Sequence, residues 1–170
     1  MLKPSDFIVI ALVAAGVGAA AVIDIKTRRV PNWLTALLAS TGVLLALSGV
    51  SGLTVVAAFS GIAVGLLLML PAHVIGATGA GDVKLLAATG ALLGPAPIAR
   101  AFLYTAIAGG ALALFVAWRR NRLQTTIGRV AALVTSPESA AAVIDAPLEN
   151  NRFPYAPAIA IGSLIAAIGL

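Results

Sequence analysis

Long apolar stretches separated by short polar breaks run through most of the chain. We distinguish six of them, covering residues 7–25, 33–50, 53–75, 83–93, 98–118 and 154–170. Most approach the roughly 20 residues that a helix needs to cross a bilayer. The breaks at Pro31-Asn32, at 48–52 and at Gly94-Pro95 are typical of tight turns. The pattern predicts an all-α, polytopic membrane protein built as a compact bundle of six transmembrane helices.

The composition favours lipid as the solvent. Of the 170 residues, 61% are hydrophobic and only 10% are charged, whereas a soluble domain carries about 25% charged residues. Six spans leave little chain for anything else, so we expect a single membrane-embedded domain over residues 1–170. Lys3 and Asp6 precede the first stretch and no clear signal-peptidase site follows it, which favours a retained first span.

The basic residues predict the topology, because lysine and arginine accumulate on the cytoplasmic side of membrane proteins. With six spans, one end of the bundle receives Lys26, Arg28, Arg29, Lys84, Arg119, Arg120, Arg122, Arg129 and Arg152. The other end keeps only Lys3 and Arg100. We therefore expect a protein of the inner (cytoplasmic) membrane with both termini on the non-cytoplasmic side, and residues 119–153 as a cytoplasmic loop.

The net charge of +5 does not indicate a nucleic-acid partner. Such a partner requires a basic patch interleaved with aromatic residues on a soluble fold, and this sequence has none. The absence of cysteine excludes disulfides, thiolate nucleophiles and cysteine-ligated metals. The single histidine, His73, makes neither a zinc site nor a serine triad, so we expect no metal and no cofactor.

Asp24 and Asp82 are the only acidic residues set into the apolar stretches. A carboxylate at membrane depth is costly, so each is a candidate functional residue. On the predicted topology both lie near the cytoplasmic boundary, where they could meet. Asp82 also ends the glycine-rich segment Gly79-Ala80-Gly81-Asp82, and an aspartate that merely caps the next helix is an equally open interpretation of that segment.

The fourth apolar stretch, 83–93, is short for a span. At helical pitch it rises about 16 Å, roughly half the thickness of the hydrocarbon layer. Either its helix begins at membrane depth after a non-helical segment over 76–81, or the bilayer thins there. Irregular backbone at that depth requires protein or water around it, so we expect a wet pocket beside Asp82.

Two blocks of sequence carry a resemblance to a known family. The first, Asp24-Ile25-Lys26-Thr27-Arg28-Arg29-Val30-Pro31-Asn32-Trp33, and the second, Gly79-Ala80-Gly81-Asp82-Val83-Lys84-Leu85-Leu86, resemble the signature blocks of the type IV prepilin peptidases. These are membrane aspartic proteases with a Gly-x-Gly-Asp motif. Phe153-Pro154-Tyr155-Ala156-Pro157 also resembles the start of the family's last helix.

The resemblance implies a function and a site. It implies cleavage of the leader peptide from prepilin-like precursors at the cytoplasmic face, with Asp24 and Asp82 as the catalytic pair and Gly79 and Gly81 shaping the loop. The chain lacks the cysteine-containing insertion of longer members, so it resembles the short form associated with tight-adherence pili, and N-methylation is left open. Two close carboxylates that share a proton can carry out general acid–base hydrolysis.

Several alternatives remain open at this stage. Lys84 could position or tune the pair, or be an interfacial lysine whose amine reaches water. The two aspartates could instead carry protons or cations in a small transporter or channel with a broken helix. A third interpretation is that the protein is a non-catalytic subunit of a secretion machine. This interpretation predicts that both aspartates tolerate replacement by asparagine.

Overall fold

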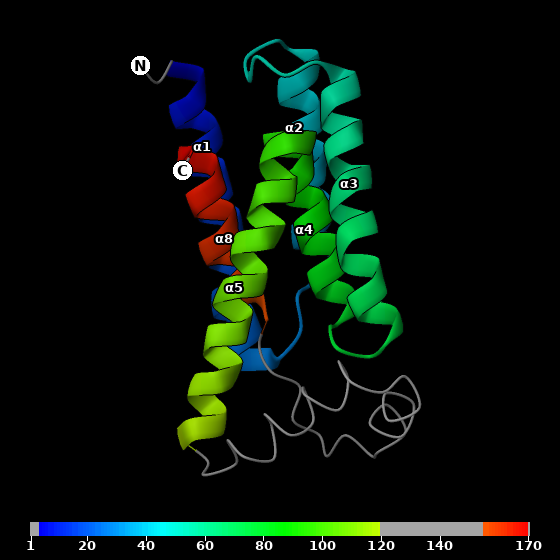
Figure 1. The fold of residues 1–170 in the computed structure, drawn as a ribbon. Coiled ribbons are helices and arrows are strands. Elements are labelled where there is room, and N and C mark those ends of the chain that lie inside the picture. Colours follow the sequence, from blue (N-terminus) through cyan, green and yellow to red (C-terminus); the bar gives the residue numbers. More distant parts are fainter. Residues whose placement is uncertain (1–3, 120–154, 170) are drawn as a thin grey trace.

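The computed structural model describes residues 4–119 and 155–169, and these ranges fold into six α-helices. The helices are α1 (Pro4–Thr27), α2 (Asn32–Leu47), α3 (Val55–Val74), α4 (Ala80–Leu93), α5 (Pro95–Arg119) and α8 (Ala156–Ile168) (Figure 1). The described part contains no strand. This confirms the predicted all-α bundle. The loop expected over 119–153 falls, apart from Arg119, outside the described residues.

Helix α4 forms the centre of the bundle. It contacts α1, α2, α3, α5 and α8, most extensively α3 and α2, and nearly all of its 14 residues are buried. Helix α8 packs between α1 and α5, so the last described helix lies beside the first (Figure 1). Direct contact between α1 and α2 is sparse by comparison.

Close helix packing in the bundle depends on small residues, as is usual inside membranes. Gly61 of α3 lies directly on the backbone of Gly90 in α4, and a Cβ at either position would overlap the partner's carbonyl oxygen. Gly42 of α2 faces Ala91 of α4 in the same way: a Cβ at Gly42 would lie 2.7 Å from the backbone carbonyl carbon of Ala91. The absence of side chains at Gly42, Gly61 and Gly90 is what lets α4 sit between α2 and α3.

The turns between helices follow the sequence signals. Gly49 and Gly52, between α2 and α3, have φ values of +73° and +68°, a conformation that glycine adopts without strain. Gly94 ends α4 with φ +79°, and Pro95 begins α5 directly after it. These short connections make consecutive helices antiparallel.

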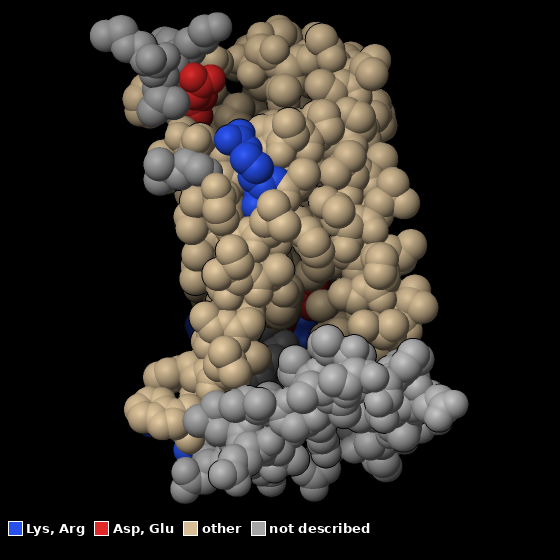
Figure 2. Space-filling view, viewed as in Figure 1, with Lys and Arg blue, Asp and Glu red and all other residues tan. Residues whose placement is uncertain are grey.

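The apolar surface identifies a membrane protein. Within the described ranges, α1, α3 and α5 are long and apolar enough to cross a membrane, and α2 and α8 are shorter apolar helices. Many large apolar side chains are exposed, and charged atoms occupy only small areas of the face in Figure 2. Helix α4 rises about 21 Å, less than the hydrocarbon thickness, but it is surrounded by the other helices and does not need to span lipid itself.

Candidate active site

Asp24 lies in the last turn of α1, near the end where α2 and α4 begin. Its side chain is only 5% exposed, and its Oδ2 accepts a hydrogen bond from the backbone N–H of Ala156 at 3.2 Å. Ala156 is the first residue of α8, whose free N–H groups carry partial positive charge. The carboxylate of α1 is therefore held by the beginning of a helix that follows it by 132 residues in the chain.

Asp82 lies in the first turn of α4 and is 8% exposed. Its Oδ2 accepts a hydrogen bond from the backbone N–H of Gly79 at 3.1 Å. This bond caps the start of α4, which is one of the two roles that the sequence predicted for Asp82. Capping occupies one carboxylate oxygen and one N–H, so it fixes the side chain without excluding a chemical role.

The two carboxylates lie at the same end of the bundle and within electrostatic reach of each other. Tyr155, which precedes α8, is half-buried and lies within electrostatic reach of Asp82. The Tyr155 ring also covers Gly109 of α5, where a Cβ would lie 2.6 Å from the ring. The structure thus places both predicted aspartates at the same end of the bundle and adds a neighbour, Tyr155, that the sequence did not single out. Tyr155 was part of a recognised block, but nothing in that block distinguished it from the adjacent prolines.

The segment between α1 and α2 closes over the start of α4. A Cβ at Gly81 would lie 3.1 Å from the Cβ of Val30, so glycine allows this segment to pack on α4. Beside it, Nζ of Lys84 donates a hydrogen bond to Oδ1 of Asn32 at 3.0 Å. Lys84 therefore bonds to the first residue of α2, and its side chain is exposed.

His73 has a structural contact near the site. Its Nδ1 forms a hydrogen bond with the carbonyl oxygen of Thr78 at 3.0 Å, across the turn that leads into Gly79. The described ranges contain no cluster of three or more histidine, aspartate or glutamate side chains that could hold a metal. They do contain two buried carboxylates at one end of the bundle, Asp24 and Asp82, each of which accepts a hydrogen bond from a backbone N–H group.

A comparison with protein families shows which family the chain belongs to. Residues 10–114 match the type IV leader peptidase family. The chain belongs to this family. Comparisons with curated proteins and with solved structures return no match.

The leader peptidase match covers Asp24, Asp82 and the glycines before Asp82, and it extends from α1 into α5. Helix α8 lies beyond the matched residues, yet its first N–H binds Asp24. A family of this kind acts in general on prepilin-like precursors. In this leader peptidase, Asp24 within the matched residues is therefore hydrogen-bonded by a helix that lies outside them.

Proposed function

We propose that this protein is an aspartic endopeptidase that removes the leader peptide from prepilin-like precursors at the cytoplasmic face of the membrane. Asp24 and Asp82 are the catalytic pair in this proposal, and Gly79 and Gly81 shape the loop that presents Asp82. The observation that carries it is the burial of both carboxylates at one end of the bundle, within electrostatic reach of each other.

The chemistry follows from two close acids. They do not both ionise cheaply, so the pair holds one proton at working pH. The ionised carboxylate takes a proton from water, whose oxygen attacks the scissile carbonyl carbon, while the protonated carboxylate donates to the carbonyl oxygen. Collapse of the tetrahedral intermediate then breaks the C–N bond as a proton passes to the leaving amine. The products are the leader's carboxylate and the new N-terminus.

The charge distribution supports the cytoplasmic face. Lys26, Arg28, Arg29 and Lys84 all stand at the end of the helices that carries the two aspartates. The positive-inside rule assigns such an end to the cytoplasm. The peptidase family match also favours cleavage over proton or cation transport by the same pair.

The test replaces each carboxylate by its uncharged isostere. Asp24→Asn and Asp82→Asn, each co-expressed with a prepilin, are expected to abolish leader removal, measured as the mass of the pilin. Asp6→Asn, in the first turn of α1 at the other end of that helix, is the matched control and should process normally. Thermal unfolding in detergent verifies that all three variants fold. Appreciable processing by either folded site variant contradicts the assignment.

A further inference from the structure

The turn between α3 and α4 is bonded to the last turn of α3 at both of its ends. At the start of the turn, Gly76 has φ +76° and its N–H donates to the carbonyl oxygen of His73 at 2.9 Å. The N–H of Ala77 donates to the carbonyl oxygen of Ala72 at 2.8 Å, which completes the Schellman motif that commonly ends a helix. At the other end of the turn, Nδ1 of His73 is 3.0 Å from the carbonyl oxygen of Thr78.

The contact with Thr78 makes Nδ1 of His73 a donor. A carbonyl oxygen can only accept a hydrogen bond, so the ring nitrogen that faces it carries the proton. His73 and Thr78 are half-buried, whereas residues 74–77 between them are all exposed. Packing therefore contributes little to holding this turn, and its hydrogen bonds determine its conformation.

The peptide group that His73 binds is the one that holds Asp82. The carbonyl of Thr78 and the N–H of Gly79 belong to a single planar trans peptide group, so they point in opposite directions. On one side the oxygen accepts from His73, and on the other the N–H donates to Oδ2 of Asp82 at 3.1 Å. Donation to the carbonyl polarises the peptide group and makes its N–H a stronger donor. One peptide plane thus links the imidazole to the carboxylate.

We infer that His73 is a positioning residue for Asp82 in catalysis. The inference rests on the proposed function, because it assigns His73 the task of orienting one of the two catalytic carboxylates. Without the imidazole, the peptide group before Gly79 is free to rotate, and its N–H turns away from Oδ2 of Asp82. Asp24 is held separately, by the N–H of Ala156, so the loss of His73 misplaces one carboxylate of the pair and not the other.

The first experiment compares three variants in the cleavage of a prepilin. His73→Phe keeps an aromatic ring and removes the donor. His73→Asn restores a donor in the same place, because the amide nitrogen of asparagine and Nδ1 of histidine are both two bonds beyond Cβ. Val74→Phe is the control, since it introduces the same ring at the next position of α3, where the side chain is 76% exposed.

His73→Phe is expected to lower kcat about tenfold or more and to leave KM unchanged, because a misplaced catalytic group impairs the reaction and not substrate binding. His73→Asn should restore most of the lost kcat, and Val74→Phe should retain all of it. Thermal midpoints in detergent verify that the variants fold. Unchanged kcat in His73→Phe, an equal loss in His73→Asn, or a rise in KM alone would overturn the inference.

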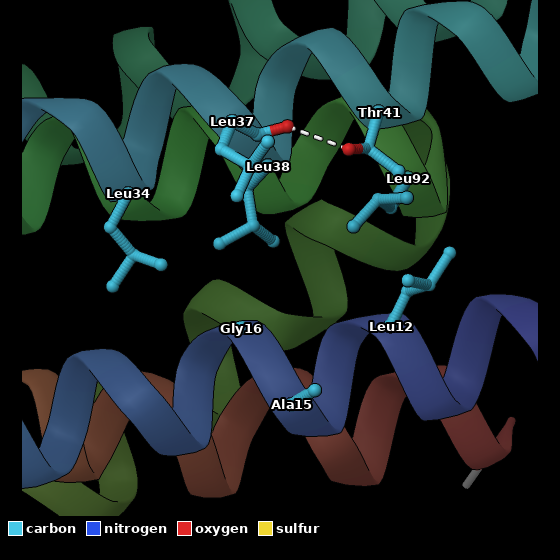
Figure 3. A pocket seen from close by; sticks show the side chains of 8 residues that line it. All are labelled: Leu12, Ala15, Gly16, Leu34, Leu37, Leu38, Thr41 and Leu92. Carbon is cyan, nitrogen blue, oxygen red and sulfur yellow. Dashed lines mark hydrogen bonds between the residues drawn. The ribbon is translucent and has the colours of Figure 1, made fainter.

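A second measurement observes the peptide group itself by NMR and does not depend on cleavage. With ¹³C in the threonine carbonyl and ¹⁵N in glycine, only a glycine that follows a threonine links the two labels. The sequence contains three such pairs: Thr41-Gly42, Thr78-Gly79 and Thr89-Gly90. The first and third lie within α2 and α4 and serve as references. Figure 3 shows Thr41 inside α2, where its hydroxyl donates to the carbonyl oxygen of Leu37 at 2.8 Å.

The Thr78-Gly79 signal is expected to shift in His73→Phe, to return toward its original position in His73→Asn, and to leave the two reference signals in place. Labelling the single histidine of the unmodified protein with ¹⁵N requires no variant, and it should show the proton on Nδ1. A ring protonated on Nε2 alone, or an unshifted Thr78-Gly79 signal in His73→Phe, would overturn the inference even if that variant is inactive. If these signals behave as expected but the unmodified protein cleaves no prepilin, the proposed function fails, and the catalytic role of His73 fails with it.

Discussion

At the scale of single residues, the position of the Asp82 carboxylate depends on Gly79. The Gly79 N–H donates to Oδ2 of Asp82 at 3.1 Å, and a Cβ at Gly79 would lie 3.2 Å from that same oxygen. The backbone of Gly79 is extended, with φ −79° and ψ 151°, a conformation open to any residue. An added methyl group therefore acts on the carboxylate and not on the backbone.

Gly79→Ala is accordingly expected to reduce catalysis more than stability. Misplacement of a catalytic group by a fraction of an ångström to 1 Å lowers kcat by about 10- to 100-fold. The measurement is kcat for prepilin cleavage alongside the thermal midpoint of the purified protein. Gly18→Ala is the control, because a Cβ there meets nothing within 4 Å. Unchanged kcat in Gly79→Ala would show that Asp82 is not held in its working position by this contact.

The residues of the site differ in how far sequence could predict them. Asp24 and Asp82 were predictable because an acid in an apolar stretch is conspicuous on energetic grounds. The N–H of Ala156 was not, because every residue except proline has such a group and only the tertiary fold selects one. Tyr155 was not predictable either, since its relation to Asp82 and Gly109 arises from the packing of α8 on α5.

At the scale of elements, the packing of α3 on α4 determines where α4 and its aspartate lie. The helices meet at Gly61 and Gly90, where the two backbones are in direct contact. Helix α4 is buried on nearly all sides, so it cannot shift away from a bulkier residue without displacing α2 or α5 as well. A single methyl group added at Gly61 would therefore force the backbones of α3 and α4 apart.

We expect Gly61→Ala to destabilise the protein by about 1–3 kcal/mol, the usual cost of overpacking a dense core. Relief of glycine's backbone entropy works in the opposite direction and is smaller, about 0.5–1 kcal/mol. Reversible unfolding in mixed detergent gives the free-energy difference, with Gly110→Ala as the control on the open face of α5. If both variants unfold at the same point, the α3–α4 crossing is looser than described.

The apolar pattern predicted the helices well but not their environments. The predicted and observed bounds agree within a few residues for α1, α3 and α8. Helix α4 begins at Ala80, earlier than the apolar stretch at 83, because the bond between Gly79 and Asp82 organises the first turn. Hydropathy alone did not reveal that this short helix is enclosed by protein, since a buried helix and a lipid-facing one are equally apolar.

At the scale of the whole molecule, the antiparallel helices concentrate charge at one end. The ends of α1 and α5 and the starts of α2, α4 and α8 meet there, near the two aspartates (Figure 1). Lys26, Arg28, Arg29 and Lys84 belong to this end. The turn between α2 and α3, at residues 48–54, lies at the opposite end and carries no lysine or arginine.

This asymmetry yields a test of the proposed orientation. Ser51→Cys in the turn between α2 and α3, and Ala77→Cys in the turn between α3 and α4, each introduce the only cysteine of the chain. Positive-inside insertion is expected to expose Ser51→Cys to a membrane-impermeant maleimide applied from outside, and to expose Ala77→Cys only after the membrane is opened. The reverse labelling would place Asp24 and Asp82 at the outer face, where a leader still attached on the cytoplasmic side could not reach them. Cleavage at the cytoplasmic face would then be untenable even if both aspartates proved essential.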